Sequence, residues 1–91
     1  MNMKTMDIVL EIVNRILQED DRKVLIRPET KLAELKIHSL VFMEIIVEIE
    51  TFFDIEFDDD KLVAESFDRV QALIDYVTMK TSYRAAAPSS V

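Results

Sequence analysis

The pair His38-Ser39 is the place in this chain where two side chains of catalytic type stand together. A nucleophilic serine needs a general base within hydrogen-bond reach and a third group that orients the base. His38 is the sole histidine of the sequence, and adjacent residues of a helix do not face each other. A serine hydrolase is therefore disfavoured, and we expect no enzymatic activity. Ser39 is then either a reactive hydroxyl for another purpose or the cap of the helix that follows it.

Acidic residues alternate with other residues between Asp54 and Glu65, in a pattern similar to a calcium-binding loop. An EF-hand loop needs a glycine for its sharp turn, and the sequence contains no glycine. The lack of cysteine excludes a thiolate site, and a single histidine nearly excludes zinc. We expect no metal site and interpret these acids as a solvated linker that leads into a short helix.

The composition describes one small acidic domain. The 91 residues carry a net charge of -7, which excludes general binding to nucleic acid, because such binding needs a basic surface. The acidic balance favours basic protein partners, with plain solvation as the competing explanation. No apolar run approaches the ~20 residues that span a bilayer, and the N-terminus has no signal-peptide pattern. We expect a cytoplasmic monomer without a membrane span.

Apolar residues at three- and four-residue spacing predict three longer helices. The first runs from Thr5 to about Gln18, with Thr5 as its N-cap. The second runs from Ser39 to about Phe53. The last follows Asp68, which we expect to cap it, and loses its pattern from Met79 onward. The apolar stripes of the three helices are Met6, Val9, Leu10, Val13, Ile16 and Leu17; Phe42, Ile45, Ile46, Ile49 and Phe53; and Val70, Leu73, Ile74 and Val77.

The connections between these helices are long. Residues 20–38 are expected to form a loop with a short helical turn over residues 30–35, held to the core by Leu25, Ile26, Leu32 and Leu35. Residues 61–65 are expected to form a short helix. The fold class is therefore all-α, a small four-helix bundle of three longer helices and one short helix. We expect residues 1–80 to form the domain and residues 81–91 to form a disordered tail.

The second helix carries aliphatic residues on the side that should face solvent. On this side Val41, Val47 and Thr51 accompany the acids Glu44 and Glu48. An isolated domain gains little from exposed aliphatic side chains, so we interpret this side as a docking surface for a protein partner.

Four stretches of the sequence, in order, resemble the acyl carrier and peptidyl carrier proteins. Residues 35–40, Leu-Lys-Ile-His-Ser-Leu, are similar to the Leu-Gly-x-Asp-Ser-Leu signature of that family. Residues 29–35 resemble the approach to the signature, residues 48–57 the end of the second helix, and residues 70–77 the last helix. Lys36 stands where the family usually has glycine, and His38 where it usually has aspartate.

The resemblance implies a four-helix carrier domain in which Ser39 carries a covalent 4′-phosphopantetheine arm. A phosphopantetheinyl transferase attaches the arm from coenzyme A. The thiol of the arm holds acyl or aminoacyl intermediates as thioesters for a loading enzyme and downstream enzymes of fatty acid, polyketide or nonribosomal peptide-type biosynthesis. The expected partner-binding residues are His38, Leu40, Val41, Glu44, Val47, Glu48 and Thr51. The alternative is a carrier-like helical interaction module that is not modified.

Overall fold

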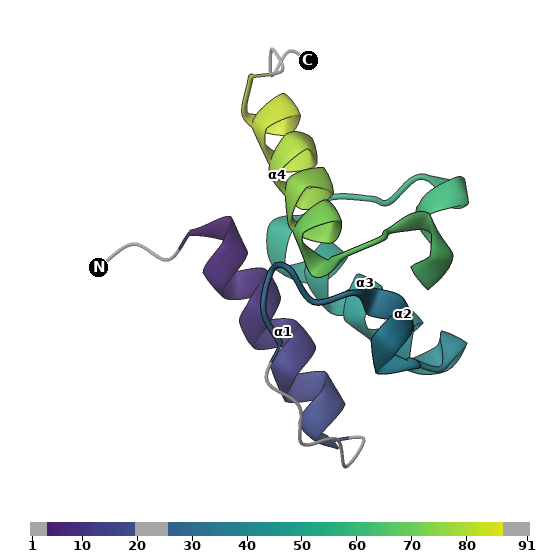
Figure 1. Ribbon diagram of the computed structural model, residues 1–91. Coiled ribbons are helices and arrows are strands. Elements are labelled where there is room, and N and C mark those ends of the chain that lie inside the picture. The colour runs from purple at the N-terminus through teal and green to yellow at the C-terminus, as the bar shows by residue number, and fades with distance from the viewer. Residues whose placement is uncertain (1–3, 20–25, 87–91) are drawn as a thin grey trace.

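The protein is a bundle of helices, which the computed structural model describes over residues 4–19 and 26–86 (Figure 1). Three helices are long and one is a single turn, so the expected all-α bundle is confirmed. In chain order the helical elements are α1 (Thr5–Glu19), α2 (Leu32–Leu35), α3 (Ser39–Phe53), the 3₁₀ turns η1 (Asp59–Lys61) and η2 (Ala64–Ser66), and α4 (Val70–Ala86).

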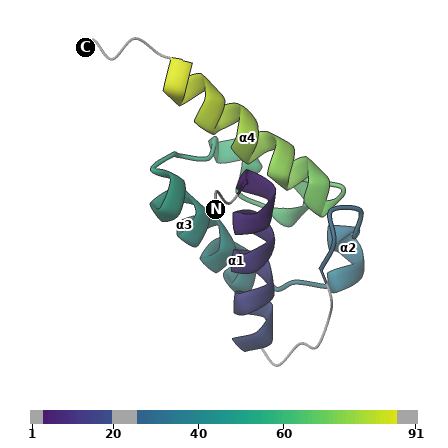
Figure 2. The same cartoon turned by 90° about the vertical axis from the view of Figure 1, so that its left-hand side faces the viewer.

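Helix α1 joins the other two long helices, because it packs against both α3 and α4. Its end lies beside the start of α3, where Ile16 and Glu19 line the same small depression as Val41 and Glu44. Helix α4 runs obliquely past the first turns of α1 (Figures 1 and 2). Ser39, at the start of α3, is thus held by a helix that packs against α1.

The core is made of apolar side chains from all four helices and from the connections. Most of the predicted stripes are buried, although Met6 is 37% exposed and Leu10 and Phe53 are only partly buried. Of the predicted loop anchors, Leu25 lies outside the described residues and the others are buried. The buried hydrophobic residues are Val9, Ile12, Val13, Ile16, Leu17, Ile26, Leu32, Leu35, Phe42, Ile45, Ile46, Ile49, Ile55, Phe57, Phe67, Val70, Leu73, Ile74 and Val77.

Two helices end on a residue in the left-handed conformation. Lys36, with φ 50° and ψ 51°, ends α2, and Asp54, with φ 57° and ψ 50°, ends α3. Glycine usually takes this position because it has no Cβ to clash with the following carbonyl oxygen. A chain without glycine must place other residues there, and Lys36 does so directly before the Ile37-His38-Ser39 segment.

The start of α4 is capped by the loop before α2 and not by Asp68, so the predicted cap was wrong. The backbone N–H of Val70 donates to the carbonyl of Thr30 at 2.9 Å, and that of Gln71 donates to the carbonyl of Pro28 at 2.7 Å. These carbonyls take the place of a side-chain cap for the first N–H groups of the helix. The loop is positioned for this by an isolated antiparallel bridge between Lys31 and Arg69.

The short helix expected at residues 61–65 is absent, and two 3₁₀ turns lie there instead. Val63 interrupts the helical course with extended dihedrals of φ -124° and ψ 148°. The hydroxyl of Ser66 donates to the carbonyl of Asp60 at 2.6 Å and closes the segment on itself. The short α-helix of the bundle is α2, within the helical turn that was expected at residues 30–35.

The ends of the long helices differ slightly from the expected ones. Thr5 is the first residue of α1 and does not precede it as an N-cap. Helix α3 has the predicted bounds, whereas α4 continues to Ala86, beyond the expected end near Met79. Residues 87–91 lie outside the described residues, and the division after residue 80 stays a prediction. No helix within the described ranges is long and apolar enough to cross a membrane.

Candidate functional site

Ser39 is the first residue of α3, and its side chain is exposed. The residue before it, His38, is the N-cap, with an extended backbone and a carbonyl that accepts from the N–H of Phe42 at 2.9 Å. No side chain caps α3 by a hydrogen bond, so the capping role considered for Ser39 is not observed. The first N–H groups of the helix therefore remain available to an anion beside the hydroxyl.

The exposed side of α3 begins next to this serine. Leu40 is 79% exposed and Val47 is 50% exposed, and Glu44, Glu48 and Thr51 are exposed as well. Leu40, Glu44, Val47 and Glu48 line one surface hollow, which does not include Thr51. Val41 differs, because it is partly buried and packs against the core. Met43, which is also partly buried and was not predicted from the sequence, lines the hollow with Leu40 and Val47.

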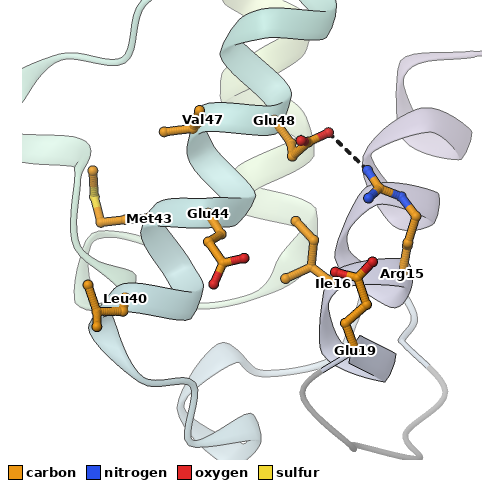
Figure 3. A pocket seen from close by; sticks show the side chains of 8 residues that line it. All are labelled: Arg15, Ile16, Glu19, Leu40, Met43, Glu44, Val47 and Glu48. Carbon is orange, nitrogen blue, oxygen red and sulfur yellow. Dashed lines mark hydrogen bonds and ion pairs between the residues drawn. The ribbon is translucent and has the colours of Figure 1, made fainter.

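Helix α1 contributes residues to the same surface, and these were also missed. A shallow groove of about 350 Å³ lies along α3 on its α1 side (Figure 3). We name it the α1–α3 groove, and its lining residues are Arg15, Ile16, Glu19, Leu40, Met43, Glu44, Val47 and Glu48. Arg15 and Glu19 are four residues apart on one face of a helix, but periodicity alone does not tell which neighbour that face meets.

An ion pair crosses this groove. Arg15 Nη2 donates to Glu48 Oε2 at 2.9 Å, and the two side chains are 48% and 50% exposed. An exposed pair of this kind contributes little to stability, at most about 1 kcal/mol. Its larger effect is on the surface, because it neutralises one carboxylate of an otherwise acidic face.

Comparison with known protein families gives a match, which covers most of the chain. A family model described as the phosphopantetheine attachment site matches residues 7–77, from the first turn of α1 to Val77 of α4. The chain belongs to this family. No curated protein matches the chain, and no solved structure does.

Members of the phosphopantetheine attachment family carry a covalently attached 4′-phosphopantetheine group, and their carrier domains are not catalytic themselves. The residues at the start of α3 fit the phosphate end of such a group. A free helix N-terminus favours a negative charge through its N–H groups and its dipole, worth typically about 0.3–1 kcal/mol at an exposed site. Among the described residues no group of His, Cys, Asp and Glu side chains could hold a metal ion.

A second depression, of about 610 Å³, lies between the end of α2 and the segment around η2. Lys36 and Ile37 form one wall, and Glu65 and Phe67, at and after η2, form the opposite one. Ser39 is not among the lining residues of either hollow, the one between α1 and α3 or the one between α2 and η2.

One cluster of titratable groups lies away from the start of α3, between the linker after α3 and helix α4. The hydroxyl of Tyr76 donates to Asp58 Oδ2 at 2.7 Å, and Lys80 Nζ lies 3.5 Å from Asp58 Oδ1. The hydrogen bond from Tyr76 lowers the pKa of Asp58, and burial raises the pKa of Tyr76. This cluster ties the linker to α4 and is structural.

Proposed function

We propose that Ser39 is the residue that carries the 4′-phosphopantetheine arm. The proposal rests on one observation: Ser39 is an exposed serine at the first position of α3, within the region that the family model matches. In the described part of the chain no hydrogen bond occupies its hydroxyl. The residues around it also resemble the carrier signature, from Leu35 to Leu40. A hydroxyl at a helix start suits a phosphodiester, because the adjacent N–H groups and the helix dipole stabilise its negative charge.

The protein's own residues then act as a platform for the arm. When bound, the arm supplies a thiol that holds an acyl or aminoacyl group as a thioester. Ser39 holds the arm at one end of α3, and the exposed residues Leu40, Val47 and Thr51 lie along the helix behind it. Partner enzymes must cover this side to reach the arm. They comprise a phosphopantetheinyl transferase, a loading enzyme and downstream enzymes of fatty acid, polyketide or nonribosomal peptide-type biosynthesis.

The attachment is tested by intact-mass spectrometry. The 91-residue protein is incubated with coenzyme A and a broad-specificity phosphopantetheinyl transferase. We expect the mass to increase by one phosphopantetheine group. Ser39→Ala should abolish the increase and leave the helical circular dichroism unchanged.

The control is Ser82→Ala, which removes an exposed serine on α4 and should be labelled like the wild type. Equal labelling of Ser39→Ala and the wild type would contradict the proposed position. A folded wild-type protein that is never labelled would favour the other function, a carrier-like interaction module without the arm.

A further inference from the structure

His38 stands at the entry into α3, with a fixed backbone and an exposed side chain. Its dihedrals are extended, at φ -66° and ψ 150°, and its carbonyl accepts from the N–H of Phe42 at 2.9 Å. The imidazole caps no N–H group of the helix and makes no ion pair with any residue of 4–19 or 26–86. The helix therefore holds the backbone of His38, while its ring can meet a group on the next residue.

The next residue is Ser39, the position proposed for the arm. A phosphodiester on the hydroxyl of Ser39 places one negative charge on the residue adjacent to the imidazole. The first turn of α3 contains no acidic residue, so no carboxylate of that turn competes for the same cation. The first N–H groups of α3 carry no side-chain cap and also favour an anion at this point.

The other charged side chains of the surrounding elements are further along the chain or line hollows that His38 does not line. They are Glu34 and Lys36 in α2 and at its end, Glu44 in α3, Glu65 and Asp68 beside η2, and Glu19 in α1. All of them are present both with and without the arm. A comparison of the two forms of the protein therefore isolates the effect of the phosphate on His38.

Imidazole is the side chain whose ordinary titration falls between about pH 5 and 8. A phosphodiester keeps its single negative charge over that whole range. A protonated ring opposes the positive end of the α3 dipole but attracts a phosphate at the same place. The charge of His38 can therefore control how firmly the start of α3 retains the phosphate.

We propose that His38 holds the phosphate of the arm when its ring is protonated, so that the base of the arm is restrained at acid pH and moves freely at alkaline pH. The inference rests on the proposed function, because it takes Ser39 as the site of attachment. It makes His38 a positioning residue for the arm. The aspartate that the family usually has at this position would instead repel the phosphate throughout this pH range.

The test compares the 91-residue protein with and without the arm, which coenzyme A and a broad-specificity transferase supply. The chain has a single histidine, so proton NMR gives one imidazole titration to follow. Attachment should move the midpoint of this titration up by about 0.5 pH unit, as expected for one exposed ion pair. The shift should shrink at about 1 M salt, where the Debye length is about 3 Å. Ser39→Ala, taken through the same incubation, should keep the midpoint of the unmodified protein.

The phosphate should report the same event from the other side. A phosphodiester has no proton to lose between about pH 5 and 8, so a change in its phosphorus NMR shift reflects its surroundings. In the modified wild type this shift should follow the imidazole titration. In modified His38→Asn, the matched neutral variant, it should stay constant, and circular dichroism verifies that the variant is folded. A phosphorus shift that still changes with pH in His38→Asn would overturn the inference.

The imidazole titration also separates this inference from the attachment itself. A mass increase at Ser39 with equal midpoints before and after attachment would contradict the role of His38 alone. A folded protein whose mass never increases would contradict both.

Discussion

The hydroxyl of Tyr76 donates a hydrogen bond to the Asp58 carboxylate at 2.7 Å and accepts one from the Asp58 backbone N–H at 2.9 Å. The ring beneath it lies 4.9 Å from the ring of Phe57 and 5.7 Å from that of Phe67, between centroids. One residue of α4 therefore holds both ends of the segment that carries η1 and η2. This segment has little regular structure of its own, so the contacts of Tyr76 substitute for backbone hydrogen bonds.

Removing the Tyr76 hydroxyl should loosen this segment. Tyr76→Phe keeps the ring contacts and loses two hydrogen bonds, and it should lower the melting temperature by roughly 4 °C. Thermal circular dichroism measures the change. In a double-mutant cycle with Asp58→Asn, the two losses should not add, because both substitutions act on one interaction. Additive losses would mean that the two side chains stabilise the protein separately.

The same pair predicts a dependence of stability on pH. The Tyr76 hydrogen bond lowers the pKa of Asp58 below its ordinary value of 3.8, so in this range the unfolded chain binds more protons than the folded one. The contribution of Asp58 is therefore present above pH 3.8 and is lost as the pH falls through the lower, folded-state pKa. The difference in melting temperature between wild type and Tyr76→Phe should be largest at pH 7 and should narrow as the pH falls below 3.8, although the loss of the bond from the Asp58 backbone N–H remains. A difference that is constant over this range would contradict the assignment.

At alkaline pH the dependence has the opposite sign, and stability falls as the pH rises. Burial raises the pKa of Tyr76 above 10.0, so above that pH the unfolded chain loses the phenolic proton first. Stability from Tyr76 is thus complete below pH 10.0 and declines as the pH rises through the folded-state pKa. Tyr76→Phe should lack this alkaline decline, which denaturant unfolding at pH 9 and pH 11 would measure.

Glycine at position 36 should stabilise the domain. Lys36 has φ 50°, a conformation that costs a residue with a Cβ about 1–2 kcal/mol. Glycine avoids this cost but loses more entropy on folding, so Lys36→Gly should raise the free energy of unfolding by roughly 0.5–1 kcal/mol. Lys31→Gly is the matched control, since Lys31 stands at the other end of α2 with φ -79° and should gain nothing. Chemical denaturation compares the two, and an equal effect of both variants would contradict the argument.

His38 should limit the rate at which the arm is attached. The family that the chain resembles usually has an aspartate at this N-cap position. A carboxylate there accepts hydrogen bonds from the backbone N–H groups of the first turn. In the family this aspartate is also associated with contacts to the metal and to the transferase. His38→Asp should raise the melting temperature and increase the initial rate of labelling by a broad-specificity transferase. His38→Asn supplies a cap without the charge, so it should reproduce the thermal gain but not the kinetic one. If Asn accelerates labelling as much as Asp, helix order and not the carboxylate governs the rate.

Much of the fold follows from local patterns in the sequence. The period of apolar residues determined that α1 and α3 exist and gave α3 its observed bounds, because a long amphipathic helix needs only its own sequence to define its buried face. The sequence predicted the start of α4 within a few residues, but it did not predict what caps this helix. Pro28 and Thr30, which accept from its first N–H groups, lie about forty residues earlier in the chain.

The site divides in the same way. The residue types around Ser39 pointed to a carrier domain, and the alternation of charge and aliphatic side chains along α3 pointed to a docking side, because both are properties of one contiguous stretch. Only the tertiary structure decided that Val41 packs against the core, that Met43 lines the hollow beside α1, and that Arg15 of α1 neutralises Glu48. Those facts depend on the rotation of α1 against α3, which is set by how the two helices pack and leaves no periodic trace in either sequence.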